Sequence, residues 1–303
     1  MVVSSRNTDL ASGLSLDGRV ALITGSGRGF GRALALAFVR SGARVVLTAG
    51  RNQAELDETL AMVDVIAPGA AVGMLADAGS RSDTDKLLDL ARLAFGGIDI
   101  LINNAARGPS DAMPVYDIAN PLPFWDAMPE RYEEVVMTNV VGPFLMARAV
   151  VPDMLARGFG RIINISTSRP TMIRRGGGPY GATKAALEVN TRVWADDLRG
   201  TGVTVNALLP GAASDTALIP GGDVGARAPS DFRPGRGTRG DLGRMDALLP
   251  ADILVPPALW IASEQSAAWT GRRIIAKDWD AGIDPSEAIR AASSEPLAMP
   301  DIL

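Results

Sequence analysis

The sequence reads VALIT at residues 20–24, GSGRGFG at 25–31 and RALALAFV at 32–39. A short apolar run is typical of a buried strand, and the alanine- and leucine-rich run after the glycines is typical of a helix. Backbone N–H groups and the dipole at the N-terminus of such a helix attract anions. The stretch therefore predicts a strand, a phosphate-binding loop and a helix, in that order.

The spacing of the glycines in this loop distinguishes between two patterns. Thr24, Gly25, Gly29 and Gly31 match TGxxxGxG, whereas GxGxxG fails because Phe30 occupies its third glycine position. A tight strand–helix turn without a ligand is the alternative that this motif leaves open. The candidate phosphate-binding residues are Gly25, Ser26, Gly27, Arg28, Gly29, Phe30 and Gly31.

Strand-like and helix-like segments alternate along most of the chain, which predicts an α/β fold with a parallel sheet covered on both faces. Right-handed crossovers then restrict the topology to a single-domain, Rossmann-type doubly wound sheet of about seven strands. The predicted strands are 20–24, 44–48, 71–75, 98–102, 161–165, 201–208 and 271–276, and the predicted helices are 31–41, 53–66, 82–95, 130–156 and 181–198.

We expect this domain to span residues 17–282, after an N-terminal extension at 1–16 and before a C-terminal tail at 283–303. Two irregular stretches interrupt the alternation, at 107–129 and from about 212 to 246. A long irregular segment inside a compact domain is usually a functional lid or a disordered loop. The second stretch is interpreted as a substrate lid.

Composition excludes several classes of protein. The 303 residues include no His and no Cys, so zinc–thiolate sites, cysteine nucleophiles and Ser-His-Asp hydrolysis are ruled out, and no metal site is expected. A net charge of −4 argues against nucleic-acid binding. No uninterrupted apolar run approaches the ~18 residues of a membrane span, and the N-terminus lacks an apolar signal core. We expect a cytoplasmic protein.

Tyr180-Gly-Ala-Thr-Lys184 opens a predicted helix, and its i,i+4 spacing places phenol and ammonium on one helix face. An unperturbed tyrosine titrates near pH ~10, too high for ready proton exchange at neutral pH. A neighbouring ammonium stabilises the phenolate and lowers its pKa. Tyr180 is thus a candidate general acid or base, the alternative being a surface helix pair.

Hydroxyl groups follow the fifth predicted strand, thirteen residues before Tyr180. This strand ends in Asn164-Ile-Ser166-Thr167-Ser168, and ligands of open α/β sheets bind at the carboxyl ends of strands. A hydroxyl here can hold a substrate oxygen while Tyr180 exchanges its proton, although such clusters also form simple strand-end turns.

The second predicted strand ends in Leu47-Thr-Ala-Gly-Arg51-Asn52, without a carboxylate. A carboxylate at this place binds a ribose 2′-hydroxyl, whereas an arginine accommodates a 2′-phosphate. Arg51, together with Arg28 in the loop, therefore favours NADP(H) over NAD(H); two solvated surface arginines are the alternative.

Together these motifs resemble the short-chain dehydrogenase/reductase family over roughly residues 18–282. They occur in the family's order: residues 24–31, Asp77 with Ala78 after the third strand, Asn103-Asn104-Ala105-Ala106 after the fourth, Asn139, the hydroxyls near Thr167, Tyr180-x-x-x-Lys184, and Pro210-Gly211.

The resemblance implies hydride transfer between a nicotinamide and an alcohol or carbonyl. It implies that Tyr180 is the acid–base residue and that Lys184 holds the nicotinamide ribose and lowers the pKa of the Tyr180 phenol. Thr167, with Ser168 as fallback, would bind the substrate oxygen. Asn139 would support a water that relays protons to Lys184. The adenosine would contact Asp77, Ala78 and the segment 103–106, in which Asn104, Ala105 and Ala106 are the candidate cofactor-binding residues. The nicotinamide would lie near Pro210 and Gly211. The family also usually forms homodimers or homotetramers, through the helices of Asn139 and Tyr180 and through the last strand.

Three positions depart from the family pattern: Thr167 stands for the usual serine, Ala106 for a glycine, and Asp215 for a threonine, with Thr216 next to it. The prediction is an NADP(H)-dependent oxidoreductase acting on a small secondary alcohol or ketone. The alternatives are a cofactor-binding sensor or scaffold that has lost the chemistry, and a redox-neutral epimerase or dehydratase.

Overall fold

The computed structural model describes residues 14–115, 120–212, 214 and 249–294. The predicted lid at 212–246, including Asp215 and Thr216, therefore lies almost entirely outside the described residues, as do most of the N-terminal extension and the end of the C-terminal tail.

A seven-stranded, fully parallel sheet forms the centre of the molecule, with strand order β3-β2-β1-β4-β5-β6-β7. This confirms the predicted doubly wound fold. The order reverses between β1 and β4, and such a switch point opens a crevice at the carboxyl ends of the strands. The strands are β1 (Val20–Ile23), β2 (Arg44–Ala49), β3 (Ala71–Leu75), β4 (Ile100–Asn103), β5 (Gly160–Ile165), β6 (Val203–Leu209) and β7 (Arg273–Ile275).

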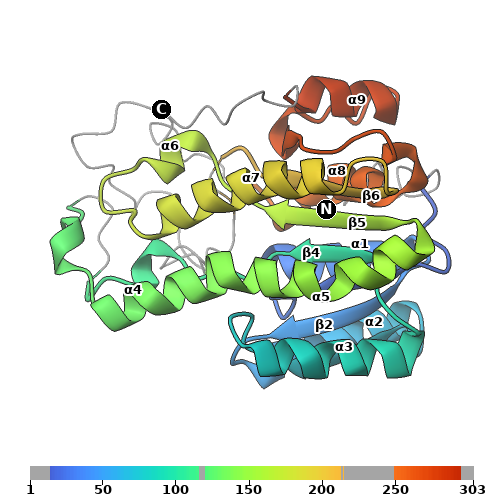
Figure 1. Cartoon of the computed structure of the whole chain (residues 1–303), viewed down its shortest axis with the longest axis horizontal. Helices are drawn as coiled ribbons and strands as arrows, with labels where there is room; N and C mark the ends of the chain where they lie inside the picture. Colours follow the sequence, from blue (N-terminus) through green and yellow to red (C-terminus); the bar gives the residue numbers. More distant parts are fainter. Residues whose placement is uncertain (1–13, 116–119, 213, 215–248, 295–303) are drawn as a thin grey trace, which may run out of the picture.

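Helices cover both faces of the sheet, each over its own apolar core. The helices α1 (Gly29–Arg40), α2 (Gln53–Ile66), α8 (Val255–Ala262) and α9 (Pro285–Ala292) pack on one face. The helices α3 (Arg81–Phe95), α5 (Gly142–Arg157) and α7 (Tyr180–Asp197) pack on the other, where α5 and α7 run side by side (Figure 1). The short helix α6 (Arg169–Met172) precedes α7.

The helix predicted at 130–156 is continuous but not uniform. It consists of α4 (Pro129–Val136), a π-helical turn at Met137–Val141, and α5. Pro143 has no N–H to donate to the carbonyl of residue 139, so the α-helical hydrogen-bond ladder is interrupted there. By length and composition alone, the stretch Pro129–Arg157 could cross a membrane, but 44% of its apolar window is buried inside the fold. The buried residues of α5 pack against α3 and β5 in the core.

The ends of the domain also contribute to the core. Leu14 and Leu16 are buried, as are Ala288 and Ile289 of α9. Ser293 forms an isolated β-bridge with Ile274 of β7. The domain boundaries at residues 16 and 283 stay predictions, although the structure packs residues on both sides of each boundary against the sheet layers.

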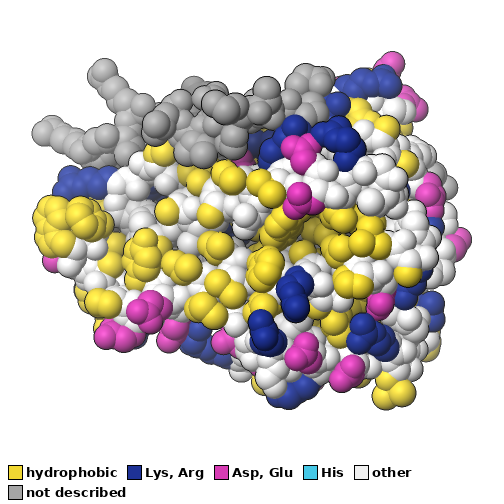
Figure 2. Space-filling model, viewed as in Figure 1, with side chains coloured by type: hydrophobic (Ala, Val, Ile, Leu, Met, Phe, Trp, Pro, Cys, Tyr) yellow, Lys and Arg dark blue, Asp and Glu magenta, His cyan; other side chains and the backbone are white. Residues whose placement is uncertain are grey.

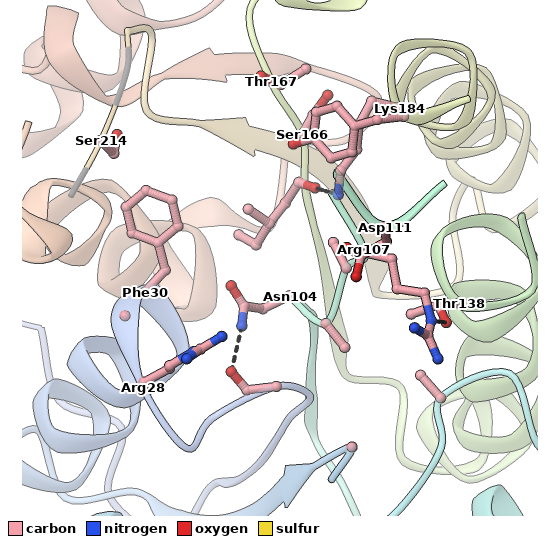
Figure 3. Close-up of a pocket in the computed structure, with 18 of the residues that line it drawn as sticks. Arg28, Phe30, Asn104, Arg107, Asp111, Thr138, Ser166, Thr167, Lys184 and Ser214 are labelled. Carbon is pink, nitrogen blue, oxygen red and sulfur yellow. Dashed lines mark hydrogen bonds between the residues drawn. The ribbon is translucent and has the colours of Figure 1, made fainter. Parts of the chain in front are cut away.

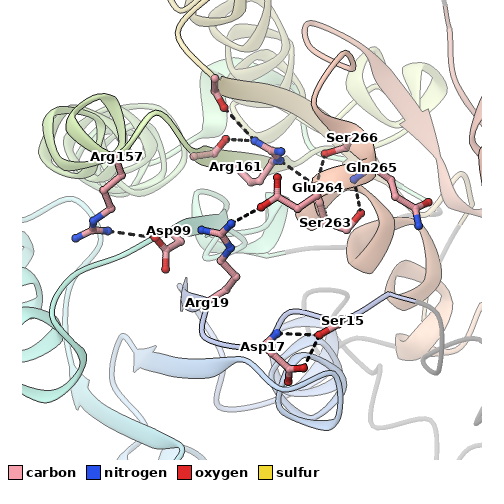
Figure 4. Close-up of polar contacts among 12 residues, drawn as sticks. Ser15, Asp17, Arg19, Asp99, Arg157, Arg161, Ser263, Glu264, Gln265 and Ser266 are labelled. Atoms are coloured by element: carbon pink, nitrogen blue, oxygen red, sulfur yellow. Dashed lines mark hydrogen bonds and ion pairs between the residues drawn. The ribbon is translucent and has the colours of Figure 1, made fainter.

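At the amino ends of the strands, a buried arginine joins β5 to its neighbours (Figure 4). Arg161 is 1% exposed and donates to the backbone oxygens of Gly160 (2.9 Å), Gly202 (3.1 Å) and Ser263 (3.2 Å). Its guanidinium also lies 4.2 Å from the ring centre of Phe159. Burial lowers the pKa of Arg161 to about 10. This network is at the end of the sheet opposite the crevice.

Candidate active site

A cavity of about 700 Å³ opens at the carboxyl ends of the central strands. This volume is within the usual range for cofactor and small-molecule sites. The glycine-rich loop lines one end and the hydroxyl-bearing end of β5 lines the other (Figure 3). Of the predicted site residues, the cavity wall includes Gly25, Gly27, Arg28, Gly29, Phe30, Arg51, Asp77, Ala78, Asn104, Ala105, Ala106, Thr167, Ser168, Tyr180, Lys184, Pro210 and Gly211.

The loop between β1 and α1 is shaped by its glycines. Gly25 has a φ of +65° and Gly29 a φ of +54°, a left-handed conformation that side chains disfavour. A Cβ at Gly31 would lie 2.3 Å from the oxygen of Gly25, so α1 could not pack this closely on the loop. Gly31 and Ser26 are buried behind the cavity wall, where the Ser26 hydroxyl donates to the oxygen of Thr48 (3.1 Å).

The N-terminus of α1 is suited to an anion. Arg28 is its N-cap residue and makes no side-chain capping hydrogen bond, and the first turn contains no acidic residue. Arg32 holds the loop from behind, donating from Nη2 to the oxygen of Gly27 (2.6 Å). The first turn of α1 itself therefore contributes no carboxylate that competes with a phosphate for its N–H groups, so this end fits the pyrophosphate of a dinucleotide.

The two arginines predicted to favour a 2′-phosphate both line the cavity, and both have carboxylate partners. Nη1 of Arg28 lies 3.1 Å from Oε1 of Glu55, and Nη2 of Arg51 lies 3.5 Å from Oε2 of Glu134. The side chain of Arg51 is 74% exposed. Both pairs are largely solvated and therefore weak.

Asn104 joins the end of β4 to the glycine-rich loop. Its Nδ2 donates to the oxygens of Thr24 and Gly25, each at 2.9 Å. The backbone N–H groups of Asn104 and Ala105 both donate to Oγ1 of Thr24 at 3.0 Å. Asn103 does not line the cavity, since its amide donates to Oδ1 of Asn164 (2.8 Å) within the sheet.

Tyr180 and Lys184 occupy the first turns of α7 and are both buried. Nζ of Lys184 lies 5.8 Å from the centre of the Tyr180 ring, so the predicted same-face relationship exists. Nζ also donates to the oxygen of Ile165 at 2.7 Å. Burial lowers the pKa of Lys184 to about 8, and the charge of Glu188 opposes this shift. The amine therefore titrates much closer to neutrality than an ordinary lysine does.

Three hydroxyls at the end of β5 line the cavity, and their hydrogen bonds differ. Oγ of Ser166 donates to Oε1 of Glu188 at 2.6 Å. Oγ of Ser168 and Oγ1 of Thr171 share a hydrogen bond of 2.9 Å. Oγ1 of Thr167 has no hydrogen-bond partner among the described residues. Of these three groups, the Thr167 hydroxyl is therefore available to a ligand without breaking an existing bond.

Asn139 lies in the π-helical turn, 1% exposed, and is not part of the cavity wall. Its Oδ1 accepts from the N–H of Arg107 (2.8 Å), and its Nδ2 donates to the oxygen of Arg107 (2.9 Å) and to Oγ1 of Thr183 (3.0 Å). The Thr183 hydroxyl in turn donates to the backbone oxygen of Tyr180 (2.7 Å). Asn139 thus links the chain after β4 to the first turn of α7.

Sequence reasoning missed several charged residues around the site. Glu188 is one turn after Lys184 on α7, a signal that the i,i+4 rule could have provided. No local sequence motif marks Arg107, Arg273 or Lys277, because their places at the site depend on strands and loops that are distant in sequence. Arg107 and Lys277 line the cavity, and Arg273 contacts the backbone that supports it. Among the described residues, no cluster of three or more metal-ligating His, Cys, Asp or Glu side chains occurs.

Comparison with known proteins defines the class. The model of the short-chain dehydrogenase family matches residues 19–220, and the chain belongs to this family of oxidoreductases. Members use a nicotinamide cofactor, and the crevice geometry above fits one. A short-chain type dehydrogenase/reductase of Picea abies is 35% identical over 211 residues, 68% of this chain and 74% of the relative.

Two further relatives agree with this assignment. An uncharacterized oxidoreductase of Staphylococcus aureus (strain N315) is 32% identical over 216 residues, 71% of this chain and 84% of the relative. Among solved structures, the 3-ketoacyl-(acyl-carrier-protein) reductase of Brucella melitensis, complexed with NADH, has a TM-score of 0.68 and 29% identity. The match covers 85% of this chain and 96% of that chain.

Proposed function

We propose that the protein is an NADP(H)-dependent oxidoreductase acting on a small secondary alcohol or ketone. One observation carries this proposal: a buried Lys184, the ring of Tyr180 beside it and a Thr167 hydroxyl without a partner among the described residues meet in the cavity that begins at the N-terminus of α1. The acid–base groups and the phosphate-binding loop thus face the same crevice.

In the reductive direction, a nicotinamide held at this crevice would supply the hydride for a carbonyl carbon. Tyr180 gives its phenolic proton to the substrate oxygen, and Lys184 stabilises the resulting phenolate as a neighbouring ammonium. Thr167 donates a hydrogen bond to the same oxygen and holds the carbonyl near Tyr180. Orientation of this kind lowers the entropic part of the barrier. Its β-branch restricts χ1, which keeps the Thr167 hydroxyl in a narrow range of directions.

For Asn139 we propose a positioning role together with the predicted water relay to Lys184. Its amide is held by Arg107 and Thr183, so it orients the first turn of α7 through the bond from Thr183 to Tyr180. The relay water stays a prediction.

Cofactor preference rests on Arg28, in the loop before α1, and on Arg51, which follows β2. Both line the cavity, and a 2′-phosphate would be a stronger partner for their guanidinium groups than the carboxylates of Glu55 and Glu134 are. NAD(H) is the less favoured alternative, and the NADH in the Brucella reductase belongs to that protein.

The experiment is a Tyr180→Phe variant assayed against a ketone panel by nicotinamide absorbance, with cofactor binding measured by calorimetry. We expect turnover to fall by about 10³-fold or more, as for loss of an essential proton donor, with cofactor affinity within threefold of wild type. Wild-type turnover in the variant would reject the assigned role. Cofactor binding without oxidation of NADPH or NADH by any ketone would favour the sensor or the redox-neutral alternatives.

We also propose that the protein forms a homodimer or homotetramer through α5 and α7. Apolar side chains lie exposed across this face (Figure 2), among them Phe144 (47% exposed), Leu155 (43%) and Val193 (48%). Exposed apolar surface of this kind supports burial against a second copy. Light scattering on wild type and Val193→Glu tests it; a monomeric wild type would contradict it.

A further inference from the structure

We propose that the substrate carries an anionic group, carboxylate or phosphate, and that Arg174 binds it. This inference rests on the proposed function and adds the substrate class. Arg174 lies on the loop between α6 and α7 and lines the cavity together with Thr167, Thr171 and Tyr180. Within the described part of the chain, its guanidinium makes no hydrogen bond or ion pair.

The backbone around Arg174 is held in place. Its N–H donates to the oxygen of Thr171 (3.5 Å), and its oxygen accepts from the N–H of Gly177 (3.0 Å). Gly177 packs directly on this carbonyl, since a Cβ there would lie 2.9 Å from it. Arg174 is partly buried, whereas Arg175 is exposed and does not line the cavity. The loop therefore presents one of the two adjacent arginines to the ligand.

Other charges at this end of the cavity leave a positive excess. Arg107 is paired with Glu134 at 3.1 Å. Lys277 extends over Gly211 on the wall and has no ion-pair partner among the residues that the structure describes. The carboxylate of Asp111 accepts the N–H of Gly108 at 2.6 Å. Among the described residues that line this part of the cavity, Arg174, Lys184 and Lys277 outnumber the carboxylate of Asp111. This balance favours an anion, and a planar guanidinium binds carboxylates and phosphates through paired donors.

The test uses the full-length protein with NADPH and matched ketones: keto acids of increasing chain length, their methyl esters and phosphate-bearing ketones. Carboxylate or phosphate should be preferred over the ester in kcat/KM. In Arg174→Gln this preference should fall by about tenfold or more, the value of one charged hydrogen bond, through KM rather than kcat. Arg175→Gln is the matched control and should retain the preference within twofold.

Three outcomes decide the matter. A wild-type enzyme that reduces esters as well as acids, or an Arg174→Gln variant with an unchanged preference, overturns the anionic assignment while the oxidoreductase proposal stands. Wild-type activity on none of the ketones, acidic or neutral, rejects the proposed function itself and this inference with it. The relative kcat/KM for carboxylate and phosphate identifies which anion the site takes.

A second, independent observation concerns the backbone that carries Thr167. The geometry points to Glu188 and Arg273 as positioning residues for the Thr167 hydroxyl. Nη2 of Arg273 donates to the oxygen of Thr167 at 3.1 Å, and its Nε lies 3.1 Å from both carboxylate oxygens of Glu188. Glu188 accepts the Ser166 hydroxyl at 2.6 Å, and Lys184 donates to the oxygen of Ile165.

Three consecutive residues at the end of β5 are therefore each held by a different side chain. The Arg273–Glu188 pair is mostly shielded, with side chains 15% and 22% exposed, so water screens it only partly. Removing one partner leaves the other charge without its counterion in a protected place, which is costly. We expect the end of β5 to loosen and Thr167 to lose its orientation.

Arg273→Met and Glu188→Gln should each reduce kcat about tenfold, the value of one charged hydrogen bond, while the KM for the cofactor stays within twofold. Arg273→Lys should restore part of the loss, and the double variant should lose less than the product of the single losses. Arg157→Met is the control, because it breaks a partly shielded pair with Asp99 at the opposite end of the sheet.

A readout independent of turnover is amide hydrogen exchange at residues 166–168, which should quicken in Arg273→Met and not in Arg157→Met. Unchanged exchange and wild-type kcat in Arg273→Met would overturn the positioning role. Equal losses of kcat in Arg273→Met and Arg157→Met at matched stability would show that the loss in Arg273→Met comes from reduced folding stability and not from the position of Thr167. Quickened exchange in a protein without ketone reductase activity would retain the role of Arg273 and Glu188 in holding the end of β5, and would reject the proposed function.

Discussion

Nζ of Lys184 lies 2.7 Å from the backbone oxygen of Ile165, so the buried amine of α7 is tied to the last residue of β5. This bond places the cationic end of the Tyr180–Lys184 pair beside the strand that carries Thr167. It also fixes a charge in a fully enclosed position, and the low pKa of Lys184 follows from that burial.

The low Lys184 pKa predicts a pH dependence of stability. The pKa falls from 10.5 in the unfolded chain to about 8 in the native protein, so the unfolded chain binds more protons between these values. Stability relative to Lys184→Met should therefore rise with pH from about 8 to about 10.5, by about 3 kcal/mol in all. Urea unfolding of both proteins across this range measures it. A constant difference would show that the amine titrates normally.

Close packing of the glycine-rich loop predicts different costs for different glycines. Gly31→Ala would push a Cβ to within 2.3 Å of the Gly25 oxygen, so we expect cofactor affinity to fall by about tenfold or more and stability by about 2 kcal/mol. Gly178→Ala is the control, because no atom lies within 4 Å of its Cβ position and Gly178 does not line the cavity. Calorimetric titration with NADPH and thermal unfolding measure both effects; equal behaviour of the two variants would contradict this packing argument.

The proposed preference for NADP(H) predicts selective losses at Arg28 and Arg51. Replacing either by Ala should raise the KM for NADPH by about tenfold, the value of one charged hydrogen bond, and leave that for NADH nearly unchanged. Steady-state kinetics with both cofactors measures the ratio of the KM for NADPH to the KM for NADH in each variant. Equal changes with the two cofactors would show that neither guanidinium contacts the 2′-phosphate.

The Arg161 network predicts a stability effect without a catalytic one. Arg161→Met removes the donor of three backbone oxygens at the amino ends of the strands, so we expect a loss of about 3 kcal/mol in the free energy of unfolding. Arg19→Met, which breaks a partly exposed ion pair with Glu264, should cost under about 1 kcal/mol. Chemical unfolding measures both, and kcat should stay within twofold at a temperature where the variants are folded.

Much of the fold and part of the candidate site follow from local patterns. Buried apolar runs predicted the seven strands, and the Gly25–Gly31 spacing predicted the loop, because a left-handed φ or a close helix approach requires glycine whatever lies elsewhere. The Tyr180–Lys184 relationship was predictable for the same reason, since i,i+4 residues of a helix share a face.

Residue partnerships across the fold were not predictable in this way. A strand-end pattern alone does not distinguish Ser166, Thr167 and Ser168, and the family resemblance only placed Thr167 before Ser168. They differ in the structure because Glu188 engages the first, Thr171 engages the third, and Arg273, 106 residues from Thr167, holds only its backbone. The interruption of the helix at 130–156 and the pairing of Arg28 with Glu55 likewise depend on tertiary neighbours.

The sequence by itself determined the doubly wound sheet, the glycine-rich loop and the Tyr180–Lys184 pair, since each depends on the conformations and spacing of residues near one another in the chain. Only the tertiary structure decided which hydroxyl remains available, which arginine faces the cavity and how strongly Lys184 is desolvated. These properties arise from burial and from contacts between strands, helices and loops far apart in the sequence.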